Sequence, residues 1–284
     1  MKILISAEST IDLPQELLDK YNIKTLPFGI FLGEELVNDR FGISDDIYKY
    51  VEETKNLPKT SAIPPEQYKE YFENLKKDYD AVIHISLSSM LSSSFNNARL
   101  ASQELEEVYV VDSKTLSTGI ALIAIKGAEL VSKGKMSAKE IYEFLQDYTA
   151  QIQASFIIEK LNYLYKGGRC SALTLLGANV LKIKPEIVLK DGRMTVGKKY
   201  IGSLNKVIGK YCDELLEEYS DPDLSHVFIT HSSPMPEVQK VLKDKLKERG
   251  FKTIHDTLAG GTICSHCGPN TIGVLFANNK KDVD

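Results

Sequence analysis

The first half of the chain alternates short apolar runs with amphipathic segments, and this rhythm limits the fold more than any other feature. Four runs are rich in β-branched residues and bounded by polar turns, as buried strands are: residues 2–6, 25–32, 81–87 and 108–111. Because strands separated by helices pair in parallel, the pattern predicts a small parallel sheet covered by helices. We therefore expect an N-terminal α/β domain over residues 1–150.

Apolar residues recur with helical spacing between and after these strands. The predicted helices cover residues 14–21, 45–53, 65–77, 95–105, 118–133 and 137–153. Asp12 and Ser44 precede the first two helices and are interpreted as their N-caps, because short polar side chains accept hydrogen bonds from the free N–H groups of a first turn. Pro65 suits the first turn of the third helix.

The order of predicted strands and helices changes near residue 150. Six strands are predicted beyond it, at residues 154–158, 186–189, 194–200, 227–231, 253–258 and 272–277, with helices at 204–219 and 237–249. Asp191-Gly192 between two of the strands is a strong hairpin signal, because both positions of the turn need a positive φ. We expect a C-terminal α+β domain over residues 151–284, with a six-stranded mixed or antiparallel sheet.

Composition excludes several classes of protein. The chain has 284 residues, of which 43% are hydrophobic, so two globular domains are expected. Its net charge of -4 argues against binding to nucleic acid. The first ten residues become polar too soon for a signal peptide, and the apolar stretch 120–131 is interrupted by Lys126 and Glu129. We predict a cytoplasmic protein without an integral membrane segment, for which any membrane contact is transient.

The four cysteines are expected to be small buried thiols. They are Cys170, Cys212, Cys264 and Cys267. The spacing of Cys264 and Cys267 around His266 also fits a zinc site, but no second close pair completes a set of four ligands. No disulfide framework, metal or cofactor is predicted.

A serine-rich turn is the most informative polar feature. Six serines fall within the nine residues 86–94, between a predicted strand and a predicted helix. Free N–H groups and the helix dipole favour an anion at such a turn, and hydroxyls add neutral donors. A cradle for a carboxylate and simple capping of the helix remain equally good interpretations.

Other hydroxyl-rich turns are expected near the same sheet edge, where ligands of parallel sheets usually bind. They are residues 7–10 and 112–119, which follow strands, and Thr60-Ser61, which precedes a helix and taken alone fits an N-cap. In the second half, the glycine-rich turn 165–169 ends in Arg169, and His266 precedes the last strand. No nucleophile elbow or nucleotide-binding fingerprint accompanies these residues, which favours binding over catalysis.

Several short motifs occur along the whole chain in a particular order and spacing. They are Ser9-Thr10 with Asp12-Leu13-Pro14, Thr60-Ser61, Ser88-Ser89-Met90-Leu91-Ser92, Val111-Asp112-Ser113, Lys166-Gly167-Gly168-Arg169 with Ser171, Ile183-Lys184-Pro185 and His266-Cys267-Gly268-Pro269. In this combination the chain resembles the DegV family, whose members include the fatty-acid-binding subunits of bacterial fatty acid kinase.

The resemblance implies a two-domain, non-catalytic protein that binds a long-chain fatty acid near the domain junction. It implies that the carboxylate is held by hydroxyls of Thr60 or Ser61, by Ser92 and the adjacent Ser93, and by His266. Arg169 would lie at the mouth or contact the partner. That partner is a separate kinase subunit, which uses ATP to convert the carboxylate to an acyl phosphate. A lipid-responsive regulator and a serine esterase or thioesterase remain alternatives.

This chain departs from the family pattern at four positions. Glu8 replaces an aspartate, Ile63 replaces a proline, Ser93 replaces a glycine and Asn270 replaces another glycine. Glycine allows a close approach of the backbone, so Ser93 is expected to change the geometry around the carboxylate most.

Overall fold

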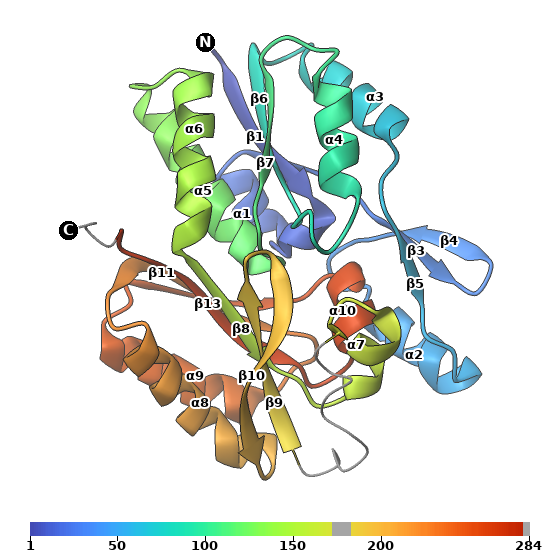
Figure 1. The fold of residues 1–284 in the computed structure, drawn as a ribbon, viewed down its shortest axis with the longest axis vertical. Helices are drawn as coiled ribbons and strands as arrows, with labels where there is room; N and C mark the ends of the chain where they lie inside the picture. The colour runs from blue at the N-terminus through green and yellow to red at the C-terminus, as the bar shows by residue number, and fades with distance from the viewer. Residues whose placement is uncertain (172–182, 281–284) are drawn as a thin grey trace.

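Two large β-sheets organise the chain, and helix α5 (Thr118–Lys133) packs against both of them (Figure 1). The computed structural model describes residues 1–171 and 183–280. One large sheet uses strands that end before residue 113 and the other uses strands that begin at residue 152. The domain boundary at residue 150 stays a prediction.

The first sheet has four parallel strands, as predicted. In spatial order they are β2 (Ile23–Leu26), β1 (Ile3–Glu8), β6 (Ala81–Ser86) and β7 (Val108–Asp112). Helices α3 (Pro65–Leu75) and α4 (Ser94–Ser102) cover one face, and α5 and α6 (Ala138–Tyr148) cover the other (Figure 1). The carboxyl ends of all four strands therefore meet at one edge.

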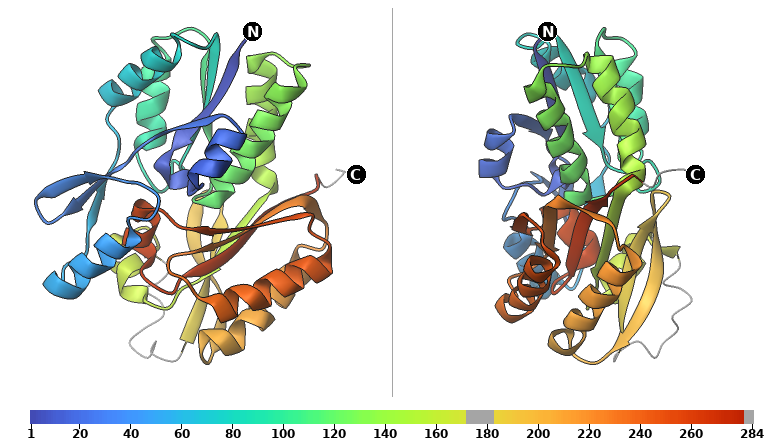
Figure 2. Two further views of the ribbon diagram at one scale, coloured as in Figure 1. Left: turned by 180° about the vertical axis from the view of Figure 1, so that it is seen from behind. Right: turned by 90° about the vertical axis from the view of Figure 1, so that its left-hand side faces the viewer.

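The prediction of one strand over residues 25–32 is wrong. Pro27 has no N–H for a strand ladder, and the chain leaves the first sheet at this point. Strand β3 (Gly29–Leu32) instead belongs to a separate antiparallel sheet with β4 (Glu35–Asn38) and β5 (Lys59–Ser61). This three-stranded sheet and α2 (Ser44–Thr54) lie to one side, next to α10 (Gly261–Cys267) (Figure 2).

The second large sheet has six strands and is mixed, as predicted. Its spatial order is β10 (Arg193–Ile201), β9 (Ile183–Lys190), β8 (Ile152–Ile157), β13 (Ile272–Asn278), β11 (Pro222–His231) and β12 (Thr253–Leu258). Strands β11 and β12 pair in parallel, and the other neighbours are antiparallel. The hairpin predicted at Asp191-Gly192 joins β9 and β10, with φ values of 50° and 79°. Helices α8 (Leu204–Glu218) and α9 (Pro236–Arg249) pack beside this sheet (Figure 1).

Both predicted N-caps are wrong. Helix α1 (Gln15–Lys20) begins after Pro14, and α2 begins after Ile43, without a side-chain cap in either case. Asp12 has a left-handed φ of 55°, and its carboxylate bonds instead to Ser117 and to the N–H of Gly260. A tertiary contact has thus replaced the local one that the sequence indicated.

Three short helical segments were not predicted, and one predicted helix is too long. The missed segments are η1 (Ser9–Ile11), α7 (Leu161–Gly167) and α10. The helix predicted over residues 137–153 ends at Tyr148, and the next three residues form η2 (Thr149–Gln151) before strand β8 begins. These segments are too short to show a helical repeat in the sequence.

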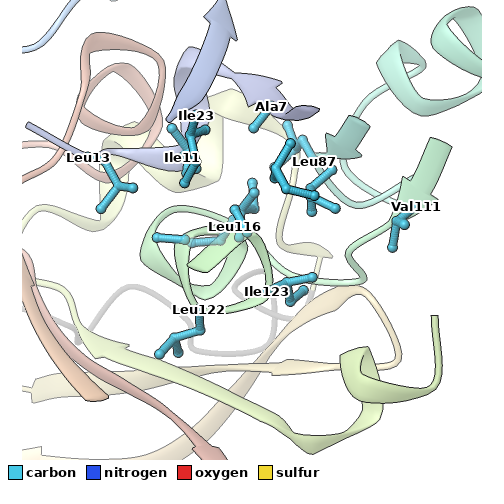
Figure 3. Packing of buried hydrophobic residues seen from close by; sticks show 14 of the residues in the cluster. Ala7, Ile11, Leu13, Ile23, Leu87, Val111, Leu116, Leu122 and Ile123 are labelled. Atoms are coloured by element: carbon cyan, nitrogen blue, oxygen red, sulfur yellow. The ribbon is translucent and has the colours of Figure 1, made fainter. Parts of the chain in front are cut away.

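Helix α5 is buried on every side in its first half. Residues 120–125 are at most 4% exposed, as expected for a helix between two layers. Figure 3 shows part of this core, in which Leu122 and Ile123 lie in one cluster with Ala7 and Leu87. In the part of the chain that the structure describes, no helix combines the length and apolar character needed to cross a membrane.

Candidate functional site

A cavity of about 110 Å³ lies beyond the carboxyl edge of the parallel sheet, at its junction with α10 and β10. Its polar lining comes from Thr60, Ser92, Ser93, Arg169, Thr262 and His266, and its apolar lining from Phe28, Ala62, Leu87, Leu91, Leu116, Met194, Ile263 and Cys267. Both halves of the chain contribute. A larger groove of about 660 Å³ beside α1 and α5 contains none of the predicted site residues.

The structure brings five of the six predicted site residues together around this cavity: Thr60, Ser92, Ser93, His266 and Arg169. Ser61 is not part of the lining. Side chains alternate between the two faces of a strand, so Ser61 points away from Thr60 on β5, and its hydroxyl donates to the carbonyl oxygen of Gly29 at 3.5 Å. The placement of Thr60-Ser61 in a strand also excludes the helix N-cap that the sequence allowed.

Thr60 and His266 meet across the cavity. The Thr60 Oγ1 atom lies 2.8 Å from His266 Nε2. Burial, and to a smaller extent the positive charge of Arg169, lower the pKa of His266 to about 4. The ring is therefore neutral near pH 7 and acts as a neutral hydrogen-bonding group.

The other nitrogen of His266 sits against a glycine. His266 Nδ1 is buried and has no hydrogen-bond partner among the described residues. A Cβ atom added at Gly167 would lie 2.6 Å from this nitrogen, so the imidazole fits only beside a residue without a side chain. The glycine-rich turn before Arg169 thus makes room for the imidazole. It lies at the end of α7, not at the start of a helix.

The serine-rich turn serves partly to hold its own shape. Ser88 Oγ donates to the carbonyl oxygen of Gly192 at 2.8 Å, which ties the turn to the β9–β10 hairpin. Ser92 Oγ accepts from the N–H of Ser94 at 3.2 Å. Ser93 has a φ of -75° and a ψ of -5°, which any residue adopts, so the serine in place of a glycine introduces no backbone strain.

Below the turn, Glu8 forms a fully buried network that the sequence did not reveal. Its Oε1 atom accepts from the Tyr68 hydroxyl at 2.6 Å and the Ser86 hydroxyl at 2.7 Å, and lies 3.1 Å from His84 Nε2. Its Oε2 atom accepts from the N–H of Leu87 at 2.9 Å. Burial raises the pKa of Glu8, but the attraction and hydrogen bonds of its partners lower it overall.

This network positions the start of the serine-rich turn. His84 Nδ1 lies 2.9 Å from Ser6 Oγ, so Glu8, His84 and Ser6 form a chain of the kind seen in hydrolases. All three side chains are fully buried, which leaves no access for a substrate. The signal in the sequence was a single acidic residue at the end of an apolar strand.

A second, mainly apolar cavity of about 30 Å³ adjoins the first. The two cavities share Leu116, Ile263 and Cys267 in their linings. The lining of the second cavity also includes Phe156 on β8 and Leu275 on β13, two strands of the six-stranded sheet. Together they lead from a polar mouth to an apolar interior.

The two cysteines of α10 are buried thiols. Burial raises the pKa of Cys267 to about 12 and raises the pKa of Cys264 as well. This disfavours the thiolate form that binds zinc. Within residues 1–171 and 183–280, no group of three or more Cys, His, Asp or Glu side chains is arranged to hold a metal ion.

Comparison with known proteins agrees with this architecture. The sequence profile of the DegV family of uncharacterised proteins matches residues 2–279. The chain belongs to the DegV family. It is 29% identical over 282 residues to a Thermotoga maritima protein named fatty acid-binding protein, with 96% of each chain covered.

Solved DegV structures have the same fold. The crystal structure of DegV from Bacillus subtilis, described as a fatty acid binding protein, superposes with a TM-score of 0.85 at 26% identity and covers 98% of this chain and 100% of that one. The fatty acid kinase B3 protein of Streptococcus pneumoniae, solved with linoleic acid, gives 0.84 at 18% identity over 98% and 100% of the two chains. At this identity the second match shows the fold alone.

Removing the buried carboxylate of Glu8 should destabilise the protein. In Glu8→Ala, His84, Tyr68 and the N–H of Leu87 lose their shared partner, so we expect the free energy of unfolding in urea to fall by about 3–5 kcal/mol. The exposed Glu34→Ala control should change it by less than about 0.5 kcal/mol. Equal effects of the two substitutions would contradict a structural role for the network.

The same network should make stability depend on pH in the acid range. The pKa of Glu8 is lower in the folded state than in the unfolded state. Its stabilisation is therefore present above the unfolded value of 4.5 and is lost as the pH falls through the folded value. Glu8→Gln should remove this part of the pH dependence.

His266 should titrate with a midpoint of about 4, because it is buried and close to Arg169. NMR of the imidazole C–H signals against pH measures this, and His266→Asn identifies the signal by its loss. Arg169→Gln should raise the midpoint, because it removes the nearby positive charge. A midpoint near 6.5 in the unsubstituted protein would show that the ring is solvated.

Proposed function

We propose that this protein binds a long-chain fatty acid and presents the carboxylate to a separate kinase subunit, which converts it to an acyl phosphate. The observation that carries the proposal is a mouth lined by Thr60, Ser92 and His266 that adjoins an apolar interior. This combination matches the two ends of a fatty acid. The fatty-acid binding described for the relatives from Thermotoga maritima and Bacillus subtilis supports it.

The head group would be held by neutral donors. A hydroxyl has one proton to donate, so Thr60 can serve the carboxylate only if it accepts from His266. In that arrangement His266 Nε2–H donates to Thr60 Oγ1, and Thr60 donates to the carboxylate. His266 Nδ1 is then the unprotonated nitrogen. Ser92 and Ser93 line the same mouth. The Ser92 hydroxyl, which donates to Ser94 Oγ at 3.0 Å, would turn to the carboxylate when the fatty acid binds.

The acyl chain would supply most of the affinity. Each buried CH₂ group contributes roughly 0.8 kcal/mol, whereas the carboxylate needs only enough donors to offset its desolvation. The proposed path runs from the mouth past Leu116 and Ile263 into the second cavity. Both side chains line the two cavities, and we propose that they move to admit the chain.

Neutral donors also suit the proposed phosphorylation. A carboxylate in a tight arginine pair is a poorer nucleophile than one held by hydroxyls. Arg169 is exposed at the mouth, where its guanidinium donates to the carbonyl oxygen of Gly167 at 2.7 Å. We propose that Arg169 contacts the ATP-bearing partner as well as the fatty acid.

A hydrolase is less well supported. An esterase needs a histidine whose second nitrogen is oriented by a carboxylate. His266 Nδ1 has no such partner among the described residues, and its Nε2 faces Thr60. We therefore propose a non-catalytic role for the chain.

Purified protein should contain a fatty acid. Denaturing extraction followed by mass spectrometry should recover about one fatty acid per chain, because a buried acyl site releases its ligand slowly. Delipidated protein should rebind it in titrations. Absence of lipid together with no rebinding would rule out the proposal. Binding without ATP-dependent acyl phosphate formation, when the kinase subunit is added, would favour the lipid-responsive regulator.

Removing either proposed donor should weaken binding without unfolding the protein. We expect Ser92→Ala and Thr60→Val each to lose about 1.5–3 kcal/mol of binding free energy, the usual contribution of a hydrogen bond to a charged group. Isothermal titration against a common fatty acid measures the change. Ser61→Ala is the matched control, because it removes a neighbouring hydroxyl that lies outside the cavity. A larger effect at Ser61 than at Thr60 would reverse the assignment.

A further inference from the structure

Helix α10 comes from the second half of the chain and packs between α7 of that half and elements of the first half. It packs against α2, β3 and β5, in a small core with Ile30 and Ile43. It also brings Thr262, Ile263 and His266 to the cavity. The distance from His266 to Thr60, which precedes it by 206 residues, therefore depends on how α10 is seated on elements of the first half.

Two buried aspartates of the first half bind the first turn of α10. Asp12 Oδ1 accepts from the N–H of Gly260 at 2.8 Å, and Asp39 Oδ1 accepts from the N–H of Gly261 at 2.7 Å. Asp12 is 2% exposed and Asp39 is 4% exposed. These two contacts satisfy N–H groups that the helix itself cannot pair.

The remaining oxygens of the two aspartates fix the carboxylates in place. Asp12 Oδ2 accepts from the Ser117 hydroxyl, at the start of α5. Asp39 Oδ2 accepts from the Ser9 hydroxyl at 2.9 Å. Asp12 and Asp39, together called the anchor, thus connect α10 to η1, which directly follows β1, and to the start of α5.

Two glycines at the start of α10 allow this close contact. A Cβ atom at Gly260, the N-cap of α10, would lie 2.8 Å from Asp12 Oδ1. One at Gly261 would lie 2.4 Å from Ile43 Cγ2, 2.6 Å from Ile30 Cδ1 and 2.9 Å from Asp39 Oδ1. All of these distances are too short for a side chain, so both positions require glycine. The apolar core around Cys264 also holds α10, and the two aspartates add directional hydrogen bonds to its first N–H groups.

We propose that Asp12 and Asp39 are positioning residues for the carboxylate site, which fix the start of α10 so that His266 meets Thr60. His266 is five residues beyond Gly261, which is about one and a half helical turns. Over so short a helix, a shift of the first turn reaches the imidazole almost undiminished. The inference rests on the proposed binding of a fatty acid.

The electrostatic cost of this anchor supports a positioning role. Burial raises the pKa of both aspartates, and the charge of Asp39 raises the pKa of Asp12 further. Two neighbouring buried carboxylates are a poor way to gain stability. Their charge-assisted hydrogen bonds fix the direction of two N–H groups.

The decisive experiment is a double-mutant cycle with Asp39→Asn and Thr60→Val. The amide introduced by Asp39→Asn has one acceptor oxygen where the carboxylate has two. The hydrogen bond from the Gly261 N–H or the one from the Ser9 hydroxyl is therefore lost. Asp39→Asn alone should weaken fatty-acid binding roughly tenfold. In the Thr60→Val background it should have little further effect, because the contact it positions is already absent. An equal loss in both backgrounds would reveal general destabilisation and overturn the inference.

NMR supplies a second readout. In Asp39→Asn the titration midpoint of His266 should move from about 4 towards the ordinary value of 6.5, because the displaced ring is less buried. The exposed Asp45→Asn is the matched control and should leave both the midpoint and the affinity unchanged. An unchanged midpoint and affinity in Asp39→Asn would also overturn the inference.

The two proposals fail separately. If the unsubstituted protein binds no fatty acid, the proposed function fails and only the NMR readout decides on the anchor. If it binds fatty acid and Asp39→Asn does not alter the site, only the anchor fails. Should Asp39→Asn not fold, Ser9→Ala removes one donor to Asp39 and keeps both carboxylates, and the same cycle is run with it.

Discussion

The burial of α5 between the two large sheets is the constraint on which the rest of the structure depends. A helix that is apolar on all sides requires layers on both faces, and here these layers are the two halves of the chain. The segment leading into α5 then forms the site. Leu116 lines both cavities, Ser117 binds Asp12, and Thr118 Oγ1 lies 2.6 Å from Thr230 Oγ1 on β11. The same segment therefore joins the two sheets and shapes the cavity.

Much of this arrangement could be predicted from local sequence patterns. The helix over residues 118–133 was predicted with its observed ends, because Gly134 marks its C-terminus with a left-handed φ of 63°. The serine-rich turn with Ser92 and Ser93 was predicted at the carboxyl edge of the parallel sheet, where ligands usually bind. Thr60, Arg169 and His266 lie on other elements, and the family resemblance assigned them to the same site. The resemblance to the DegV family supplied His266 and the ligand, which spacing alone did not indicate.

The buried polar contacts that were missed join residues far apart in the sequence. Glu8 binds residues 60 to 79 positions away, and Asp12 binds Gly260 across 248 positions. Asp12 precedes a helix and has the chemistry of an N-cap, so the local signal was real but weaker than the tertiary one. Helix α10 is only seven residues long, so the sequence shows no helical periodicity for it. Its start is bound by two aspartates that are distant in the sequence.

The pairing of β5 with β3 gives the site an unusual tolerance to error. Thr60 lies opposite Ile30, so its hydroxyl faces the cavity while that of Ser61 faces away. Shifting a strand by one residue exchanges its two faces. Because the next residue is also a hydroxyl donor, a shifted β5 would still offer an O–H group to the cavity, lacking only a methyl group. A one-residue deletion in the loop before β5 would therefore bring Ser61 to the position of Thr60 and keep a hydroxyl there, whereas a one-residue insertion would bring Lys59 there.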